Sequence, residues 1–282
     1  MKFIAYRLCY RGVNFIWALM MGVGKLFVID GNDGSGKRTQ AKRLVAHLED
    51  EGIPTAIADF PQYGQKSAGL VENYLSGKYG SSSEVDPKVA SVFYAVDRFD
   101  ASFRIREDLK NGKFVVCNRY VSASMGHQAG KIKDRIARRA YIQWLEELEF
   151  NIFKIPRPDA TVLLHVPPHV AEGLAGAKKP GEFFGRIKGD IHESDAKHLI
   201  NADKAFLEVA KEKGWKIIEC VRDGKILPVE EIHGMVWAEV RNTLRIVRDD
   251  KRGKGKNGQI LEKSCRRSKK LTLRKIKTEN HI

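Results

Sequence analysis

Short apolar runs alternate with longer amphipathic segments along most of the chain. The runs lack clean polar alternation, as expected for strands covered on both faces of a sheet, and they span 26–30, 55–59, 114–117, 161–166 and 216–220. The segments between them repeat apolar residues at helical spacing, over 36–51, 86–109, 132–152, 195–214 and 229–247. This alternation predicts an α/β fold with a five-stranded, parallel, doubly wound sheet flanked by helices.

The longest helical segment begins at Asp86 and Pro87, because aspartate caps helix N-termini and proline favours the first helical position. Apolar residues recur along it at helical spacing and are expected to face the core: Val89, Val92, Phe93, Val96, Phe99 and Phe103.

The net charge of +15 over 282 residues is concentrated at the two ends of the chain. Residues 26–247 carry 33 basic and 31 acidic side chains, whereas 248–282 carry 13 basic and 4 acidic ones. We therefore expect a folded domain over 23–247 and a basic disordered tail over 248–282, more simply a solvated appendage than a nucleic-acid-binding segment. Residues 1–22 are expected to be a disordered extension or to precede the true start, and their apolar run is too short to span a membrane.

The four cysteines are widely separated and lack the spacing of a zinc or redox site. Cys117 and Cys220 end apolar runs and are interpreted as buried thiols. This usage is typical of a reducing compartment and indicates a cytoplasmic protein with no disulfide framework.

A glycine-rich motif directly follows the first apolar run and opens a helix, which is the context of a phosphate-binding P-loop. Its backbone N–H groups and helix N-terminus bind phosphate oxygens, and Lys37 bridges the β- and γ-phosphates. Arg38 replaces the hydroxyl residue that usually follows this lysine and ligates Mg²⁺. Either Thr39 or water then takes that position, or metal binding is weak. The candidate nucleotide-binding residues are Gly31, Asn32, Asp33, Gly34, Ser35, Gly36, Lys37, Arg38 and Thr39.

Three further motifs follow in order: Phe60-Pro61, YAVDRF at 94–99 and NRYVSASMGHQAG at 118–130. Together with the loop GNDGSGKRTQ they resemble landmarks of the thymidylate kinase family, and the resemblance runs from residue 26 to about residue 247. It implies an enzyme that uses ATP and Mg²⁺ to phosphorylate dTMP to dTDP. It also implies a homodimer paired through helices, so the apolar helix 86–109 either serves that role or lies in the core.

The resemblance assigns roles to individual residues. Arg119 is expected to clamp the monophosphate, and Arg98 to reach the pyrimidine. Asp33 accepts a hydrogen bond from the sugar 3′-hydroxyl, and Gln128 lies near the base or sugar. The remaining candidates on the substrate side are Phe60 and Tyr94, where Tyr94 either stacks on the base or is one more core aromatic.

The chain departs from the family pattern at several positions. Asn118 stands where the family has aspartate, a carboxylate that would hold Mg²⁺, so Thr39 and Asn118 are the candidate metal-side residues. Gln62 and Tyr63 replace an arginine clamp after Phe-Pro, and His127 replaces an aromatic residue. These changes leave open a kinase for another deoxynucleoside monophosphate, or a nucleotide-binding protein with weakened catalysis.

A glycine- and charge-rich loop over 180–195 is expected to be a lid that supplies cations to the transferring phosphoryl group. Arg186 is the first candidate, which gives a catalytic set of Lys37, Arg119 and Arg186, and Lys188 is the second. Asp223-Gly-Lys falls where the family has a loop beside the adenine.

Overall fold

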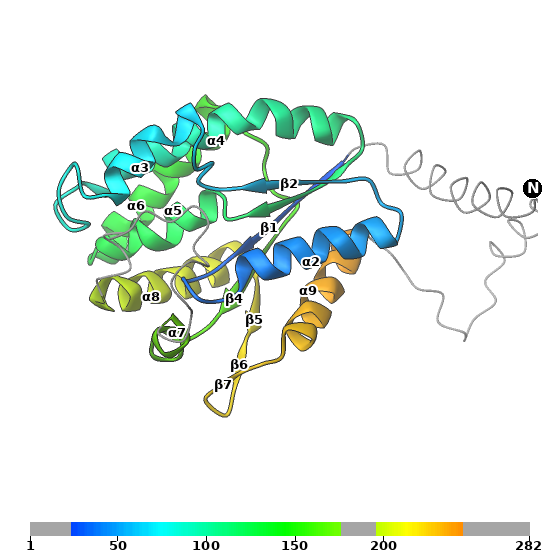
Figure 1. Cartoon of the computed structure of the whole chain (residues 1–282). Helices are drawn as coiled ribbons and strands as arrows, with labels where there is room; N and C mark the ends of the chain where they lie inside the picture. Colours follow the sequence, from blue (N-terminus) through cyan, green and yellow to red (C-terminus); the bar gives the residue numbers. More distant parts are fainter. Residues whose placement is uncertain (1–23, 176–195, 245–282) are drawn as a thin grey trace, which may run out of the picture. The chain divides into compact units, whose positions relative to one another are not determined.

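Five parallel strands form the centre of the protein, whose computed structural model describes residues 24–175 and 196–244 (Figure 1). The order across the sheet is β2-β3-β1-β4-β5. The strands are β1 (Lys25–Asp30), β2 (Thr55–Asp59), β3 (Phe114–Asn118), β4 (Ala160–His165) and β5 (Lys216–Glu219). All five predicted strands are therefore confirmed within one or two residues, and so is the doubly wound parallel sheet.

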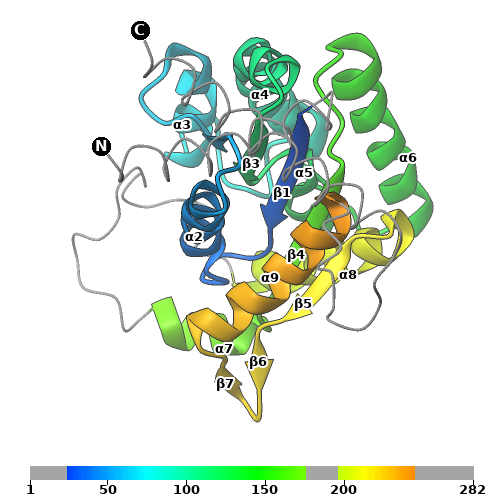
Figure 2. The same ribbon diagram turned by 90° about the vertical axis from the view of Figure 1, so that its right-hand side faces the viewer.

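Helices cover both faces of this sheet (Figures 1 and 2). One face carries α2 (Lys37–Asp50) and α9 (Val229–Leu244), and the other carries α4 (Pro87–Lys110), α5 (Val121–His127), α6 (Arg135–Glu146) and α8 (Ala196–Lys213). The main buried cluster lies on the second face, where sheet residues such as Leu26 and Val115 contact Ile105, Leu145 and Val209. Strands without polar alternation fit this arrangement because both of their faces are buried.

Short elements complete the described chain, and periodicity did not predict them. They are α3 (Gly69–Leu75), α7 (Pro168–Ala175), the 3₁₀ turns Lys66–Ala68 and Ala129–Lys131, and a hairpin of β6 (Val221–Arg222) and β7 (Lys225–Ile226). Asp223 and Gly224, at the hairpin turn, both have positive φ, as an Asp-Gly hairpin turn requires. α6 starts three residues later than expected, because Asp134 caps it by accepting a hydrogen bond from Ala137 N. A π-helical segment (Glu147–Ile152) then continues α6.

The orientation predicted for α4 is wrong. The helix begins as expected, with Asp86 accepting a hydrogen bond from Lys88 N and Pro87 at its first position. However, five of the six residues assigned to the core are exposed, from 37% to 60%: Val89, Val92, Val96, Phe99 and Phe103. Only Phe93 is partly buried, and it packs against the cluster around Tyr74. The buried side of α4 instead carries small and polar residues: Ala90, Ser91, Ala95, Asp97, Arg98, Ala101, Ser102 and Ile105.

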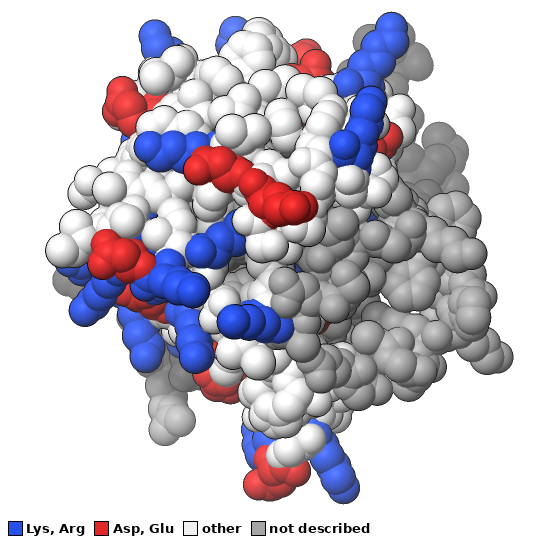
Figure 3. Space-filling model, turned by 90° about the vertical axis from the view of Figure 1, so that its left-hand side faces the viewer, with Lys and Arg blue, Asp and Glu red and all other residues white. Residues whose placement is uncertain are grey.

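Charged side chains on the described surface alternate in sign. Figure 3 shows lysines and arginines in separate groups, several of them beside aspartates or glutamates. Between α6 and α8, for example, Arg135 and Arg138 both pair with Glu208, and Arg139 pairs with Glu212. This matches the near-balance of charge counted over 26–247. Among the described residues, no helix is both long and apolar enough to cross a membrane.

Candidate active site

The loop between β1 and α2 has the backbone of a phosphate cradle. Gly31, Gly34 and Gly36 all have positive φ, at +146°, +81° and +81°, a region that glycine enters without steric cost. Gly31 has a second constraint, since an added Cβ would lie 2.3 Å from the Leu164 carbonyl oxygen. The loop then opens onto the N-terminus of α2, where backbone N–H groups and the helix dipole favour an anion.

Asp30 connects this loop to α5 through hydrogen bonds. The carboxylate is fully buried and accepts hydrogen bonds from Gly31 N (2.9 Å) and Ser122 Oγ (2.5 Å). Burial raises the pKa of Asp30, while the charges of Arg119 and Lys37 and these hydrogen bonds oppose the rise. Sequence reasoning did not single out Asp30, although a carboxylate ending a buried strand before a P-loop is a visible signal.

Two cations meet at the loop carboxylate Asp33. Arg119 forms an ion pair with Asp33 Oδ1, and Lys37 Nζ lies 3.7 Å from the same oxygen. Lys37 also donates to the Asn32 carbonyl oxygen at 2.7 Å, and Arg119 Nη1 lies 3.0 Å from His127 Nε2. The structure thus brings together the predicted P-loop lysine, the predicted phosphate clamp and the predicted sugar-binding carboxylate.

Arg119 is held in an uncommon backbone conformation. Its φ is +65°, where residues other than glycine are infrequent and often mark functional sites. The backbone N–H of Arg119 donates to the Ile29 carbonyl oxygen at 3.0 Å, so the turn after β3 is tied to β1. This geometry directs the side chain from the carboxyl edge of the sheet toward the P-loop.

The metal-side candidates form a polar edge beside the loop. Asn118 Nδ2 donates to Asp59 Oδ1 at 2.5 Å, and Arg38 donates to Asp59 Oδ2 through Nη2 (2.7 Å) and Nε (3.1 Å). Thr39 is exposed in the first turn of α2. Sequence reasoning missed Asp59, although it ends a predicted strand at the same edge as Asn118.

Arg98 lies in a buried polar network. Its guanidinium forms a two-fold ion pair with Glu149, at 2.7 and 2.6 Å, and donates to Tyr120 O and Ser124 Oγ. Four of its five N–H donors are thereby used, and the side chain is 2% exposed. In this arrangement Arg98 connects α4 to α5 and the π-helical segment, and its contact with the pyrimidine stays a prediction.

The other substrate-side candidates occupy different depths. Phe60, which precedes a cis proline, lies in the main core against Tyr120, and its contact with substrate stays a prediction. Tyr94 is half-buried beside Tyr74, and its hydroxyl is close enough to influence the Arg119 charge. Gln128 is 1% exposed, and its Oε1 accepts no hydrogen bond from the described residues.

Gln62 occupies the place of the expected arginine clamp and is bound within the protein. Its backbone N–H donates to Asp97 Oδ2 at 2.9 Å and its amide donates to the Asp97 carbonyl oxygen at 3.1 Å. Ser67 Oγ donates to the same carboxylate at 2.7 Å. Gln62 therefore fastens the segment after β2 to α4.

A polar cluster around His165, next to the loop residue Asn32, was also not predicted. Asn32 Nδ2 donates to Asp203 Oδ1 at 2.6 Å, and His165 Nε2 lies 3.4 Å from the same oxygen. His165 Nδ1 is 2.5 Å from Glu219. The contacts with Asp203 and Glu219, opposed by burial, raise the pKa of His165 to about 9. The signal was weak, because Asp203 is 171 residues from Asn32 in sequence.

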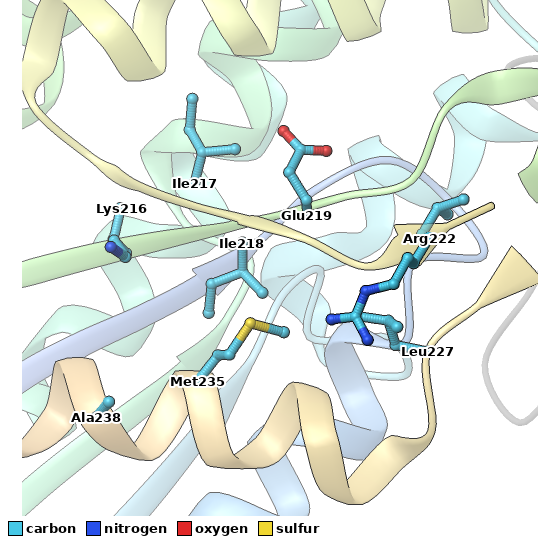
Figure 4. Close-up of a pocket in the computed structure, with 9 residues that line it drawn as sticks. Lys216, Ile217, Ile218, Glu219, Arg222, Leu227, Met235 and Ala238 are labelled. Atoms are coloured by element: carbon cyan, nitrogen blue, oxygen red, sulfur yellow. The ribbon is translucent and has the colours of Figure 1, made fainter. Parts of the chain in front are cut away.

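A cavity of about 400 Å³ lies apart from the predicted site, between β5, the hairpin and α9. Figure 4 shows Ile218 of β5 and Met235 of α9 facing it, with Arg222 at one side. Arg222 is paired with Glu231 at 2.7 Å. Of the predicted site residues that the structure describes, none lines it.

The predicted lid, with Arg186 and Lys188, lies outside the described residues, as do the segments 1–22 and 248–282. The two cysteines predicted to be buried thiols, Cys117 and Cys220, are confirmed as buried and free.

Comparison with known proteins agrees with the geometry of the loop and Arg119. The family model of thymidylate kinase matches residues 29–232. The chain belongs to the thymidylate kinase family. It is therefore a nucleotide-binding phosphotransferase that uses ATP, as the resemblance implied, and a passive binding module is not favoured.

Relatives of this family cover most of the chain. A thymidylate kinase of Mycobacterium tuberculosis is 30% identical over 194 residues, which cover 67% of this chain and 87% of the relative. A probable thymidylate kinase of Pyrococcus horikoshii is 31% identical and covers 78% and 98%. A solved thymidylate kinase of Candida albicans has a TM-score of 0.60 at 20% identity, covering 79% of this chain and 94% of that one, and this likeness supports the fold.

Proposed function

We propose that this chain transfers the γ-phosphoryl group of ATP to dTMP, giving ADP and dTDP. The observation that carries the proposal is the convergence of Lys37 and Arg119 on Asp33. Phosphoryl transfer needs positioning and charge neutralisation more than covalent help from the protein. The P-loop cation and the cation opposite it, which converge on the Asp33 carboxylate, supply both when two nucleotides meet end to end.

In this mechanism, the loop N–H groups and Lys37 hold the β- and γ-phosphates of ATP. Arg119 clamps the monophosphate of dTMP, because a guanidinium binds phosphate oxygens with two parallel hydrogen bonds. Asp33, which occupies Arg119 in the structure, then accepts a hydrogen bond from the sugar 3′-hydroxyl. Tyr94 and Gln128 line the acceptor site near the base of dTMP. Arg186 of the lid supplies a further cation during transfer.

Mg²⁺ completes the proposed site. The Asn118 Oδ1 atom fits this ion, because it is a buried oxygen that accepts no hydrogen bond from the described residues, and Mg²⁺ prefers oxygen ligands. Asn118 and Thr39 are the residues proposed to hold it, directly or through water. When bound, Mg²⁺ neutralises charge on the β- and γ-phosphate oxygens.

A coupled assay of ADP formation with dTMP, dUMP, dCMP and dGMP tests the function. We expect the highest kcat/KM with dTMP. Lys37→Met should lower kcat by about 100-fold or more, whereas Lys42→Met, on an exposed position of the same helix, should not. Turnover restricted to a purine would refute dTMP as the acceptor. Metal-nucleotide binding without turnover on any acceptor would instead favour weakened catalysis.

The exposed apolar side of α4 supports a homodimer. Five side chains on this side are each 37% or more exposed: Val89, Val92, Val96, Phe99 and Phe103. The ring centroids of the two phenylalanines lie 5.3 Å apart. Exposed apolar patches of this kind mark protein interfaces. Sedimentation should give a dimer that Val96→Asp with Phe103→Asp converts to a monomer. Ile136→Asp, at an 81% exposed site on α6, is the control that should leave the dimer intact.

We place the enzyme in the cytoplasm, because two buried cysteines remain unpaired thiols and reducing compartments favour that state. Cell fractionation with an antibody to the chain tests this. Recovery only with organelles would contradict it.

A further inference from the structure

The polar edge of the site contains a carboxylate to which no motif assigns a role. Asp59 ends β2, and the parallel pairing of β2 with β3 sets it beside Asn118, the position where the family pattern has aspartate. The two side chains touch, since Asn118 Nδ2 lies 2.5 Å from Asp59 Oδ1. The negative charge that is absent at position 118 is therefore present one strand away, at the same edge of the sheet.

We infer that Asp59 has taken over this charge and that Asp59 and Asn118 together anchor the divalent cation that accompanies the nucleotide phosphates. The inference rests on the proposed phosphoryl transfer and names the residue that makes its metal site complete.

The amide of Asn118 is oriented for this task. Its NH₂ group faces the Asp59 carboxylate, because the reverse orientation would bring oxygens of the two side chains together. Its Oδ1 consequently points elsewhere, is buried, and accepts no hydrogen bond from the described residues. Because that oxygen points away from the carboxylate, Asn118 Oδ1 ligates the cation directly and Asp59 reaches it through a water of its shell, since Mg²⁺ usually keeps several waters.

Arg38 balances the negative charge of the Asp59 carboxylate before a metal binds. Its Nη2 and Nε both donate to Asp59 Oδ2, with side-chain exposures of 51% for Arg38 and 37% for Asp59. An ion pair so exposed contributes little stability, so a dication that arrives with nucleotide competes with Arg38 for that oxygen. Arg38 lies in the first turn of α2, from where a displaced guanidinium reaches the phosphates of the adjoining loop.

Binding of Mn²⁺ to the full-length chain saturated with ADP tests the inference, with free Mn²⁺ followed by electron paramagnetic resonance. Asp59→Asn should raise the Mn²⁺ Kd by about tenfold or more. Arg38→Met should lower it, because a competing charge is gone. Asp50→Asn, which removes one exposed carboxylate at the C-terminal end of α2, is the matched control and should leave it unchanged.

The reciprocal exchange gives the sharpest result. Asp59→Asn with Asn118→Asp moves the carboxylate back to β3 and should restore most of the Mn²⁺ affinity. An unchanged Kd in Asp59→Asn, or a double variant as weak as that single variant, would overturn the inference. ADP affinity in EDTA and thermal unfolding identify any variant that fails to fold, and Asp59→Ser then serves as a second neutral variant.

These outcomes are separate from the test of the proposed function, because Mn²⁺ binding is measured without dTMP and without turnover. A chain that loses Mn²⁺ through Asp59→Asn but phosphorylates no dTMP would keep the metal anchor and lose the dTMP assignment. Turnover of dTMP with Mn²⁺ affinity independent of Asp59 would do the opposite.

Discussion

Replacing Glu149 with glutamine removes the charge that balances Arg98 and should destabilise the protein strongly. The two side chains are 2% and 0% exposed and share two hydrogen bonds of 2.7 and 2.6 Å. Removing one partner of such a pair leaves an uncompensated buried charge, which costs about 3–5 kcal/mol. That is a large share of the roughly 5–15 kcal/mol that holds a typical domain folded.

Urea unfolding followed by circular dichroism measures this cost. Glu212→Gln, in an ion pair whose partners are 55% and 41% exposed, is the control and should change the free energy of unfolding by less than about 1 kcal/mol. Arg98→Met with Glu149→Leu removes both charges and should recover much of the loss, because apolar replacement of a buried pair is often neutral.

A loss below about 1 kcal/mol in Glu149→Gln would refute the structural role of this pair. The double variant also separates packing from recognition. If Arg98 reads the pyrimidine, the KM for dTMP rises in the double variant even where stability is recovered. If Arg98 only braces α4, KM follows the stability of the fold.

Two further predictions follow from other contacts. Gly126→Ala should lower the free energy of unfolding by about 1–3 kcal/mol, because its Cβ would lie 2.3 Å from the Phe206 ring. Gly234→Ala in α9, with nothing within 4 Å of its Cβ, should instead raise the free energy of unfolding by up to about 1 kcal/mol. Equal effects of the two substitutions in urea unfolding would contradict this. His165, whose folded pKa is raised to about 9, should contribute stability below its unfolded pKa of about 6.5 that is lost as pH rises through 9. His165→Gln should flatten that slope in thermal unfolding at pH 6 to 9.5, and an unaltered slope would exclude the histidine.

The strands and the phosphate-binding loop could be predicted because each is encoded locally. A run such as 26–30 is apolar on both faces, and the loop glycines mark backbone that only glycine adopts freely. α3, α5 and α7 are too short for a period of 3.6 residues to show. The predicted orientation of α4 is wrong for a different reason. Apolar residues on one side of a helix do not by themselves show whether that side packs into the core or stays exposed.

The pairings at the site depend on contacts across long sequence separations. Arg98 and Glu149 are 51 residues apart, and Asp59 and Asn118 are 59 apart. The motif that contains Arg98 is visible in the sequence, but its partner Glu149 is not, so the internal ion pair could not be predicted. No motif marks Asp59, because only the pairing of β2 with β3 brings it beside Asn118.

The pairing of β2 with β3 places the last residues of the two strands, Asp59 and Asn118, side by side at one edge of the sheet. A functional group needed at that point can be encoded at either position, and substitution at one can be offset at the other without moving the backbone. Loss of an acidic residue from a single alignment column is then a poor criterion for an inactive kinase. In this chain, the combined composition of positions 59 and 118 is the more informative quantity, and it also provides two positions at which metal preference could be engineered.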